Sequence, residues 1–205
     1  MRGYYTVNNG EYSLEIKRSE FIAYSYSIES EEQAIKLIED LRKKHYDARH
    51  VCFAYVVDEL GNRARFSDDG EPGGTAGMPI LDAIKNNELK KTLIAVVRYF
   101  GGILLGAGGL VRAYSDSAAG VIRESGRKFM RYSDLYEITA DYSLYKRISR
   151  SIEALGSVES IEYGSGVTVV LSVENGCEVI NKLTDASSGK AEIKFIGNDY
   201  TETQI

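Results

Sequence analysis

Apolar residues recur along the start of the chain at spacings that change from those of strands to those of a helix. Segments 11–17 and 21–28 are rich in Tyr, Ile and Leu with partial alternation, which predicts two strands. Ser30 then opens a capping box, and apolar residues follow it at helical spacing as far as Leu41. We therefore expect a helix over residues 30–45.

The next part of the chain predicts a hairpin, two helices and a buried strand. Residues 51–57 and 63–66 are β-prone runs around a turn-rich linker. A helix is expected to begin between Thr75 and Met78, because Pro79 is tolerated only in a first helical turn. Residues 92–100 are continuously apolar, which favours a central strand buried on both faces. Small and apolar residues from Leu110 onward indicate another helix.

The last third of the chain alternates strand and helix patterns in an order typical of a split βαβ module. The expected elements are strand 134–142, helix 143–155, strand 157–163, strand 167–173, helix 176–187 and strand 191–197. We expect a domain boundary near 128–134, with domains 1–130 and 131–205. The predicted fold class is α+β: an N-terminal α/β domain followed by a C-terminal ferredoxin-like (βαββαβ) domain.

Composition narrows the class of protein without deciding its function. The chain has 25 Lys and Arg residues against 30 Asp and Glu residues, a net charge of -5, so nucleic-acid binding needs a local basic surface or backbone donors. No apolar stretch approaches the ~18 residues of a membrane span, and the N-terminus lacks signal-peptide features. The two cysteines form no disulfide or zinc pattern. We expect a cytoplasmic protein without a membrane partner.

A first glycine-rich segment, residues 66–77, follows the predicted hairpin and ends at a helix. Its glycines and threonine lie just before the predicted helix, where exposed backbone N–H groups can bind a phosphate. Its carboxylates alternatively suit Mg²⁺, or form an acidic turn that caps the helix. The candidate anion-binding residues are Gly73, Gly74, Thr75 and Gly77, and the possible acidic or metal-binding residues are Asp68, Asp69 and Glu71.

A second glycine-rich segment, residues 98–110, joins the buried strand to the next helix. It matches neither the Walker motif nor the dinucleotide fingerprint. Its arginines and aromatic rings suit contact with phosphate and base, while close packing of the glycines and rings is the alternative. The candidate nucleic-acid or anion-binding residues here are Arg98, Tyr99, Gly101, Gly102, Gly106, Gly108, Gly109 and Arg112.

The two histidines offer little catalytic chemistry. His50 and Cys52 stand two apart on a predicted strand and so share a face, which permits a Cys-His pair of poor geometry. A core role for His50 is the favoured interpretation. His45 is expected to be a capping or surface residue at a helix end. No Ser-His-Asp set is found, and no catalytic residue or cofactor is assigned.

Both glycine-rich segments resemble the YigZ/IMPACT family. The resemblance is carried by His50-x-Cys52, by the run Ser67 to Leu81 and by the run Val97 to Tyr114. It implies a first domain similar to the second domain of the ribosomal protein S5 group, and a domain pair similar to one in elongation factor G. Eukaryotic members regulate translation through an additional N-terminal domain absent from this chain, so their partner is not carried over.

Two functions of different classes remain open from the sequence. The first is a non-enzymatic RNA- or ribosome-associated protein, such as a regulator of translation, that binds phosphate backbone through glycine-rich loops at helix starts. The second is a metal-dependent enzyme acting on a small phosphorylated or peptide substrate. The first function is favoured, because no convincing set of metal ligands and no nucleophile-base pair is found in the sequence. Its expected partner is RNA or the ribosome. A small-molecule substrate is the alternative.

Overall fold

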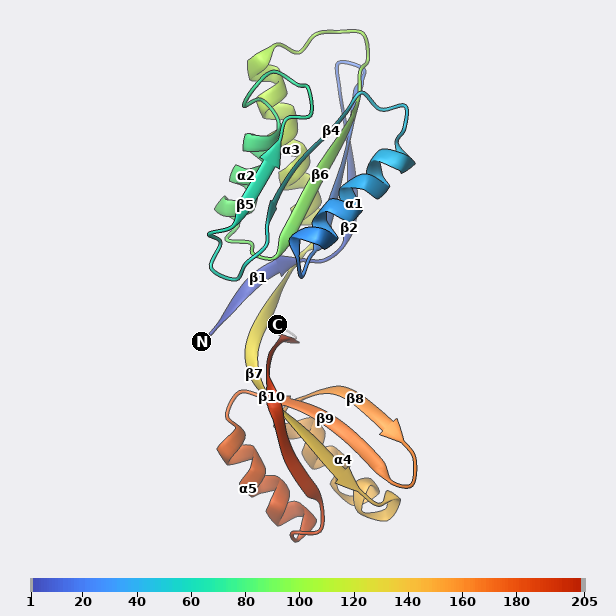
Figure 1. Ribbon diagram of the computed structural model, residues 1–205, viewed down its shortest axis with the longest axis vertical. Helices are drawn as coiled ribbons and strands as arrows, with labels where there is room; N and C mark the ends of the chain where they lie inside the picture. The colour runs from blue at the N-terminus through green and yellow to red at the C-terminus, as the bar shows by residue number, and fades with distance from the viewer. Residues whose placement is uncertain (1, 204–205) are drawn as a thin grey trace. The chain divides into compact units, whose positions relative to one another are not determined.

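The computed structural model describes residues 2–203 of the chain, which divide into two compact units (Figure 1). One unit comprises Tyr4–Phe129. The other is formed by the chain from Met130 onward together with Arg2 and Gly3. Together the units mix helices and strands, which confirms the predicted α+β class.

The first unit is a five-stranded sheet with helices on both faces. Its elements are β1 (Gly3–Val7), β2 (Gly10–Ile16), β3 (Ser19–Ser27), α1 (Glu31–Lys44), β4 (His50–Val56), β5 (Ala64–Ser67), α2 (Gly77–Asn86), β6 (Thr92–Tyr99) and α3 (Ala107–Ser125). The strand order in this sheet is β2-β3-β6-β4-β5, and β1 lies outside it. The predicted hairpin is confirmed, because β4 and β5 pair antiparallel. The strand β1 was not predicted.

The central strand β6 has its side chains divided between two cores. Ile94 and Val96 belong to the core made with α2 and α3, whereas Leu93, Ala95 and Val97 pack on the side of α1. All five side chains are fully buried. The prediction of a strand covered on both faces is therefore confirmed, and the apolar run lacks alternation because both faces are dry.

The helix α1 begins as the capping box predicts. The Ser30 hydroxyl accepts a hydrogen bond from the Gln33 N–H at 3.2 Å, and the Gln33 side chain accepts one from the Glu29 N–H at 2.7 Å. The helix ends at His45, whose ring is buried and not a surface group. Its two ring nitrogens each lie 2.9 Å from a tyrosine hydroxyl, those of Tyr24 and Tyr99. Burial lowers the pKa of His45.

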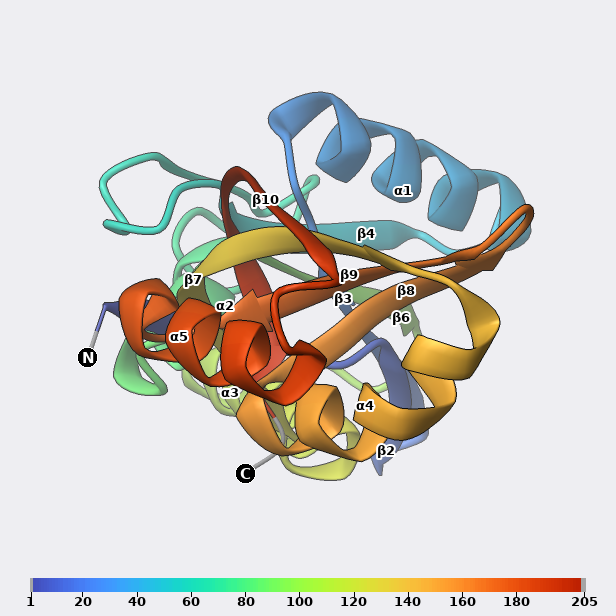
Figure 2. The same cartoon turned by 90° about the horizontal axis from the view of Figure 1, so that it is seen from below.

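The second unit has the predicted βαββαβ order. Its elements are β7 (Arg127–Ala140), α4 (Tyr142–Leu155), β8 (Ser157–Tyr163), β9 (Val167–Val173), α5 (Gly176–Ser187) and β10 (Glu192–Thr203). This sheet has five strands in the order β1-β7-β9-β8, with β10 also paired to β7, and α4 and α5 lie side by side over one face of it (Figures 1 and 2). Within residues 2–203, no helix is long and apolar enough to cross a membrane.

Candidate functional site

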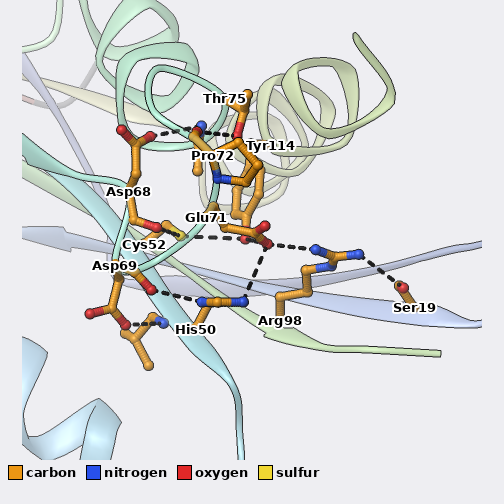
Figure 3. Close-up of polar contacts among 12 residues, drawn as sticks. Ser19, His50, Cys52, Asp68, Asp69, Glu71, Pro72, Thr75, Arg98 and Tyr114 are labelled. Carbon is orange, nitrogen blue, oxygen red and sulfur yellow. Dashed lines mark hydrogen bonds and ion pairs between the residues drawn. The ribbon is translucent and has the colours of Figure 1, made fainter. Parts of the chain in front are cut away.

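The most buried charged pair of the first unit joins the two glycine-rich segments. Arg98, near the end of β6, donates from Nη1 to Oε1 of Glu71 at 2.6 Å (Figure 3). The Tyr114 hydroxyl of α3 donates to the same carboxylate oxygen at 2.9 Å. The side chains of Arg98 and Glu71 are only 7% and 4% exposed, so this carboxylate is held inside the protein by a cation and a phenol.

The strand register explains why His50 and Cys52 join this cluster. β4 runs antiparallel to β6 with His50 opposite Arg98, and alternate residues of each strand face α2 and α3. His50 Nδ1 donates to the Asp69 carbonyl oxygen at 2.7 Å, because a carbonyl only accepts. This bond orients the ring and leaves Nε2 4.0 Å from Glu71 Oε1.

Cys52 is part of the core and not of a nucleophilic pair. Its Sγ lies 3.0 Å from the Asp68 carbonyl oxygen and 3.4 Å from the Tyr114 hydroxyl. Burial raises the pKa of the thiol to about 12, so it is protonated at neutral pH. The prediction that His50 and Cys52 share a face of the sheet is confirmed, but the thiol is directed to Asp68 and Tyr114.

The start of α2 already holds an anion, the Asp68 side chain of the acidic loop (residues 68–76). Its carboxylate accepts hydrogen bonds from the N–H groups of Gly74, Ala76 and Gly77 at 2.8–3.0 Å. Burial opposes ionisation, but these bonds outweigh it and lower the pKa of Asp68. The predicted anion donors at Gly74 and Gly77 are thus occupied from within the chain. The Thr75 hydroxyl donates to the Pro72 carbonyl, and Gly73 has open space around it.

The three carboxylates proposed as metal ligands do not converge. Asp69 forms an ion pair with Arg42 at 2.7 Å and accepts a hydrogen bond from the Val51 N–H, while Asp68 faces α2 and Glu71 faces Arg98. Over the described part of the chain, no group of three or more His, Cys, Asp or Glu side chains is placed to hold a metal ion. The metal interpretation of these residues is corrected accordingly, since each carboxylate has its own partner.

The start of α3, in contrast, has no side-chain cap. Gly106 precedes the first helical residue with φ 72°, and among residues 2–203 no side chain is placed to accept a hydrogen bond from the first turn. A Cβ added at Gly102 or at Gly108 would meet nothing within 4 Å. A Cβ at Gly101 would lie 2.0 Å from the Arg18 backbone, and one at Gly109 3.0 Å from Leu105. The glycine loop (residues 100–106) and the turn after it therefore contain both packed and open glycines.

The two arginines predicted as phosphate contacts differ in accessibility. Arg98 is buried in its ion pair, so it is not the surface contact that the sequence predicts. Arg112 is exposed on α3. The Tyr99 hydroxyl donates to Asp47 at 3.2 Å and lies beside His45, away from the glycine loop. Tyr114 was not among the predicted site residues; its signal in the sequence was its place at the end of the run Val97 to Tyr114 that resembles the family.

A pocket of about 360 Å³ lies between the acidic loop, the end of β6 and the start of α3. Its polar wall includes Glu71, Arg98 and His50, and Gly106 and Ala107 line it from the start of α3. The Nε of Arg98 is buried and has no hydrogen-bond partner. The two glycine-rich segments thus meet at one cavity.

Comparison with known proteins assigns the architecture described above to a family. Residues 17–122 match the Impact N-terminal domain, and residues 138–190 match a domain of unknown function, DUF1949. The chain belongs to the IMPACT family. The Bacillus subtilis IMPACT family member YvyE is 36% identical over 212 residues, covering 100% of this chain and 96% of that protein. The Escherichia coli member YigZ is 36% identical over 191 residues, 89% of this chain and 92% of that protein.

A solved relative of this IMPACT family member has the same extent. The crystal structure of a hypothetical protein aligns with a TM-score of 0.62 at 30% identity, covering 96% of this chain and 98% of that one. The suspected family resemblance is therefore confirmed over the whole chain.

Proposed function

We propose that this IMPACT family member is a non-enzymatic protein of translation that associates with RNA, either free or in the ribosome. Its contact with the phosphate backbone is assigned to the start of α3 and the open part of the glycine loop. The family resemblance supports the link to translation, and the geometry of α3 supports the mode of binding.

The observation that carries the proposal is the contrast between two helix starts. The first N–H groups of any helix have no acceptor within the helix and attract anions. At α2 those groups bind the Asp68 carboxylate, whereas at α3 no side chain caps them. The N–H groups at the start of α3 therefore lack an acceptor, and an RNA phosphate could supply one.

Local positive charge supports the same surface despite the net charge of the whole protein. Arg112 is exposed about one and a half turns into α3, and Arg49 is exposed at the edge of the neighbouring pocket. Neither arginine forms an ion pair within the part of the chain that the structure describes. Both are therefore available to neutralise phosphates and release counterions.

The test is RNA binding measured by fluorescence anisotropy over a series of salt concentrations. Removing one phosphate contact lowers the salt slope by about one, so Arg112→Ala is expected to weaken binding and to reduce the slope by that amount. Arg49→Ala is expected to behave in the same way. Arg150 is exposed on α4 and has no ion pair with any residue that the structure describes, so Arg150→Ala provides the matched control.

If Arg112→Ala and Arg49→Ala bind RNA with the same affinity and salt slope as the wild type, the start of α3 is not the RNA-binding surface. Absence of RNA or ribosome binding by the wild-type protein at low salt would overturn the function itself.

A further inference from the structure

The pocket beside the start of α3 has two chemically different walls. Arg98, Glu71 and His50 form its polar wall, while Phe100, Leu104 and Leu105 form an apolar one. Its volume of about 360 Å³ lies within the ~300–1,000 Å³ range of small-molecule sites. Leu104 is 81% exposed and Phe100 42% exposed, so apolar surface is open to solvent at this side of the cavity.

Two groups of hydrogen-bond donors at the pocket lack an acceptor. The Arg98 side chain is 7% exposed and lines the pocket, yet its Nε has no partner. Ala107 lines the same pocket at the first position of the uncapped helix α3. A buried donor without an acceptor, such as the Arg98 Nε, is costly. The start of α3 is exposed at Ala107 and Gly108, and its N–H groups add donors that face an anion in the pocket.

The carboxylate already in the pocket does not supply this acceptor. Oε1 of Glu71 receives hydrogen bonds from Arg98 Nη1 and from the Tyr114 hydroxyl (Figure 3). The charge of Glu71 is thereby compensated, while the Arg98 Nε and the first turn of α3 keep free donors. An incoming group with several acceptor oxygens matches this arrangement better than a cation or a purely apolar molecule does.

We propose that this pocket binds a small phosphomonoester. The phosphate group would accept from the first N–H groups of α3 and from Arg98, and a compact apolar or aromatic body would lie against Phe100, Leu104 and Leu105. The inference goes beyond RNA association, with which it shares the start of α3, the glycine loop and Arg49 at the edge of the pocket. Free phosphomonoesters and the phosphorylated end of an RNA carry the same chemistry.

The test uses isothermal titration calorimetry of the full-length protein with phenyl phosphate, inorganic phosphate and phenol. Phenyl phosphate is expected to bind more tightly than either fragment, because it alone reaches both walls. Oligonucleotides with and without a 5′-phosphate then distinguish an RNA end from a free ligand as the source. A preference for the phosphorylated oligonucleotide over phenyl phosphate assigns the site to the RNA end; the reverse order assigns it to a small molecule.

Ala107→Pro is the sharpest variant for the phosphate group. Proline is favoured at the first helical position, and the ψ of 166° at Gly106 suits a residue before proline, so the helix is retained while one N–H donor is lost. Losing one charge-assisted hydrogen bond is expected to weaken phenyl phosphate and inorganic phosphate by about tenfold.

Leu104→Ala tests the apolar wall separately. Since Leu104 is largely exposed, its truncation leaves the fold intact and is expected to weaken phenyl phosphate severalfold without changing inorganic phosphate. No heat with phenyl phosphate at millimolar concentration, or binding unchanged in both variants, overturns the pocket proposal. If phenyl phosphate binds and RNA does not, the pocket proposal stands and RNA association fails. If RNA binds and phenyl phosphate does not, RNA association stands and the pocket proposal fails.

Discussion

Glu71 and Arg98 lie 27 positions apart in the chain, yet Arg98 Nη1 is 2.6 Å from Glu71 Oε1 in the interior of the first unit. The acidic loop provides one charge and the central strand β6 the other. Each residue comes from a different glycine-rich segment, so this pair fastens the two segments to each other. Tyr114 adds a third element, α3, to the same carboxylate.

Removal of either charge from this pair is expected to destabilise the protein strongly. Glu71→Ala and Arg98→Ala each leave an uncompensated buried charge, at a cost of about 3–5 kcal/mol in the free energy of unfolding. Urea denaturation measures the loss. The double variant is expected to lose less than the sum of the two single variants, because neither charge is then left alone.

The pair Lys182–Glu178 provides the control, since it has the same N–O distance of 2.6 Å but both side chains are more than half exposed. Lys182→Ala is expected to cost about 0–1 kcal/mol. Losses of similar size at the buried and exposed pairs would contradict the role given to burial.

Asp68 is expected to stabilise α2 in a pH-dependent way. Asp68→Ala removes the acceptor for three backbone N–H groups, which is expected to cost about 1–2 kcal/mol. The pKa of Asp68 is lowered in the folded protein, so this stabilisation is present above the ordinary value of 3.8 and is lost as the pH falls through the folded pKa.

Thermal unfolding at pH 7 and near pH 3 measures this effect. The difference between wild type and Asp68→Ala is expected to shrink at the lower pH. Asp82→Ala, at an exposed position of α2, is the control and is expected to change stability by less than about 0.5 kcal/mol. A difference that stays constant between the two pH values argues against the capping role.

The two cysteines are expected to differ sharply in reactivity. Cys52 is buried with its pKa raised to about 12, whereas Cys177 is exposed. Alkylation follows the exposed thiolate, so iodoacetamide at pH 8 is expected to modify Cys177 and to leave Cys52 unmodified. Mass spectrometry of the intact protein and of its peptides measures this. Unfolding in guanidinium should make both cysteines react, and prompt modification of Cys52 in the native protein would contradict its burial.

Gly108 is expected to serve ligand access rather than folding. It lies in the first turn of α3, and a Cβ there would meet nothing within 4 Å. Gly108→Ala is therefore expected to keep or raise the melting temperature, since alanine favours a helix by up to about 1 kcal/mol. Binding of phosphate ligands is expected to weaken, because the methyl group hinders close approach to the helix start.

Gly120→Ala is the contrasting variant of the same helix. A Cβ at Gly120 would lie 2.2 Å from the Tyr12 ring, so this substitution is expected to lower the melting temperature markedly. Equal effects of the two substitutions on stability would mean that the first turn of α3 is packed as tightly as the region around Gly120.

Local patterns in the sequence were sufficient for the order of the elements. Residues 157–163, 167–173 and 176–187 form the predicted elements with the predicted bounds. In 167–173 and 176–187 the pattern follows from burial of one face, whereas every residue of 157–163 is exposed. The capping box at Ser30 likewise predicted α1 from interactions within one turn. The strand β1 was missed, since it is a short segment near the N-terminus without a distinctive pattern of apolar and polar residues.

The candidate site depended on contacts between segments far apart in the chain. The sequence identified both glycine-rich segments and named Arg98, Asp68 and Glu71, but it treated Arg98 as a surface group and the carboxylates as one cluster. Strand register and the path of the acidic loop place these side chains against different partners. Such partners are not encoded at any fixed spacing.

The sequence by itself thus determined the family, the α+β class and the segments in which polar chemistry is concentrated. The tertiary structure decided which helix start is free and which is occupied. The N–H groups at the start of α2 donate to the Asp68 carboxylate, whereas the start of α3 lines a pocket beside Arg98. The physical reason is that hydrogen-bond donors attract whichever acceptor the fold brings within about 3 Å, and only the folded chain sets that distance.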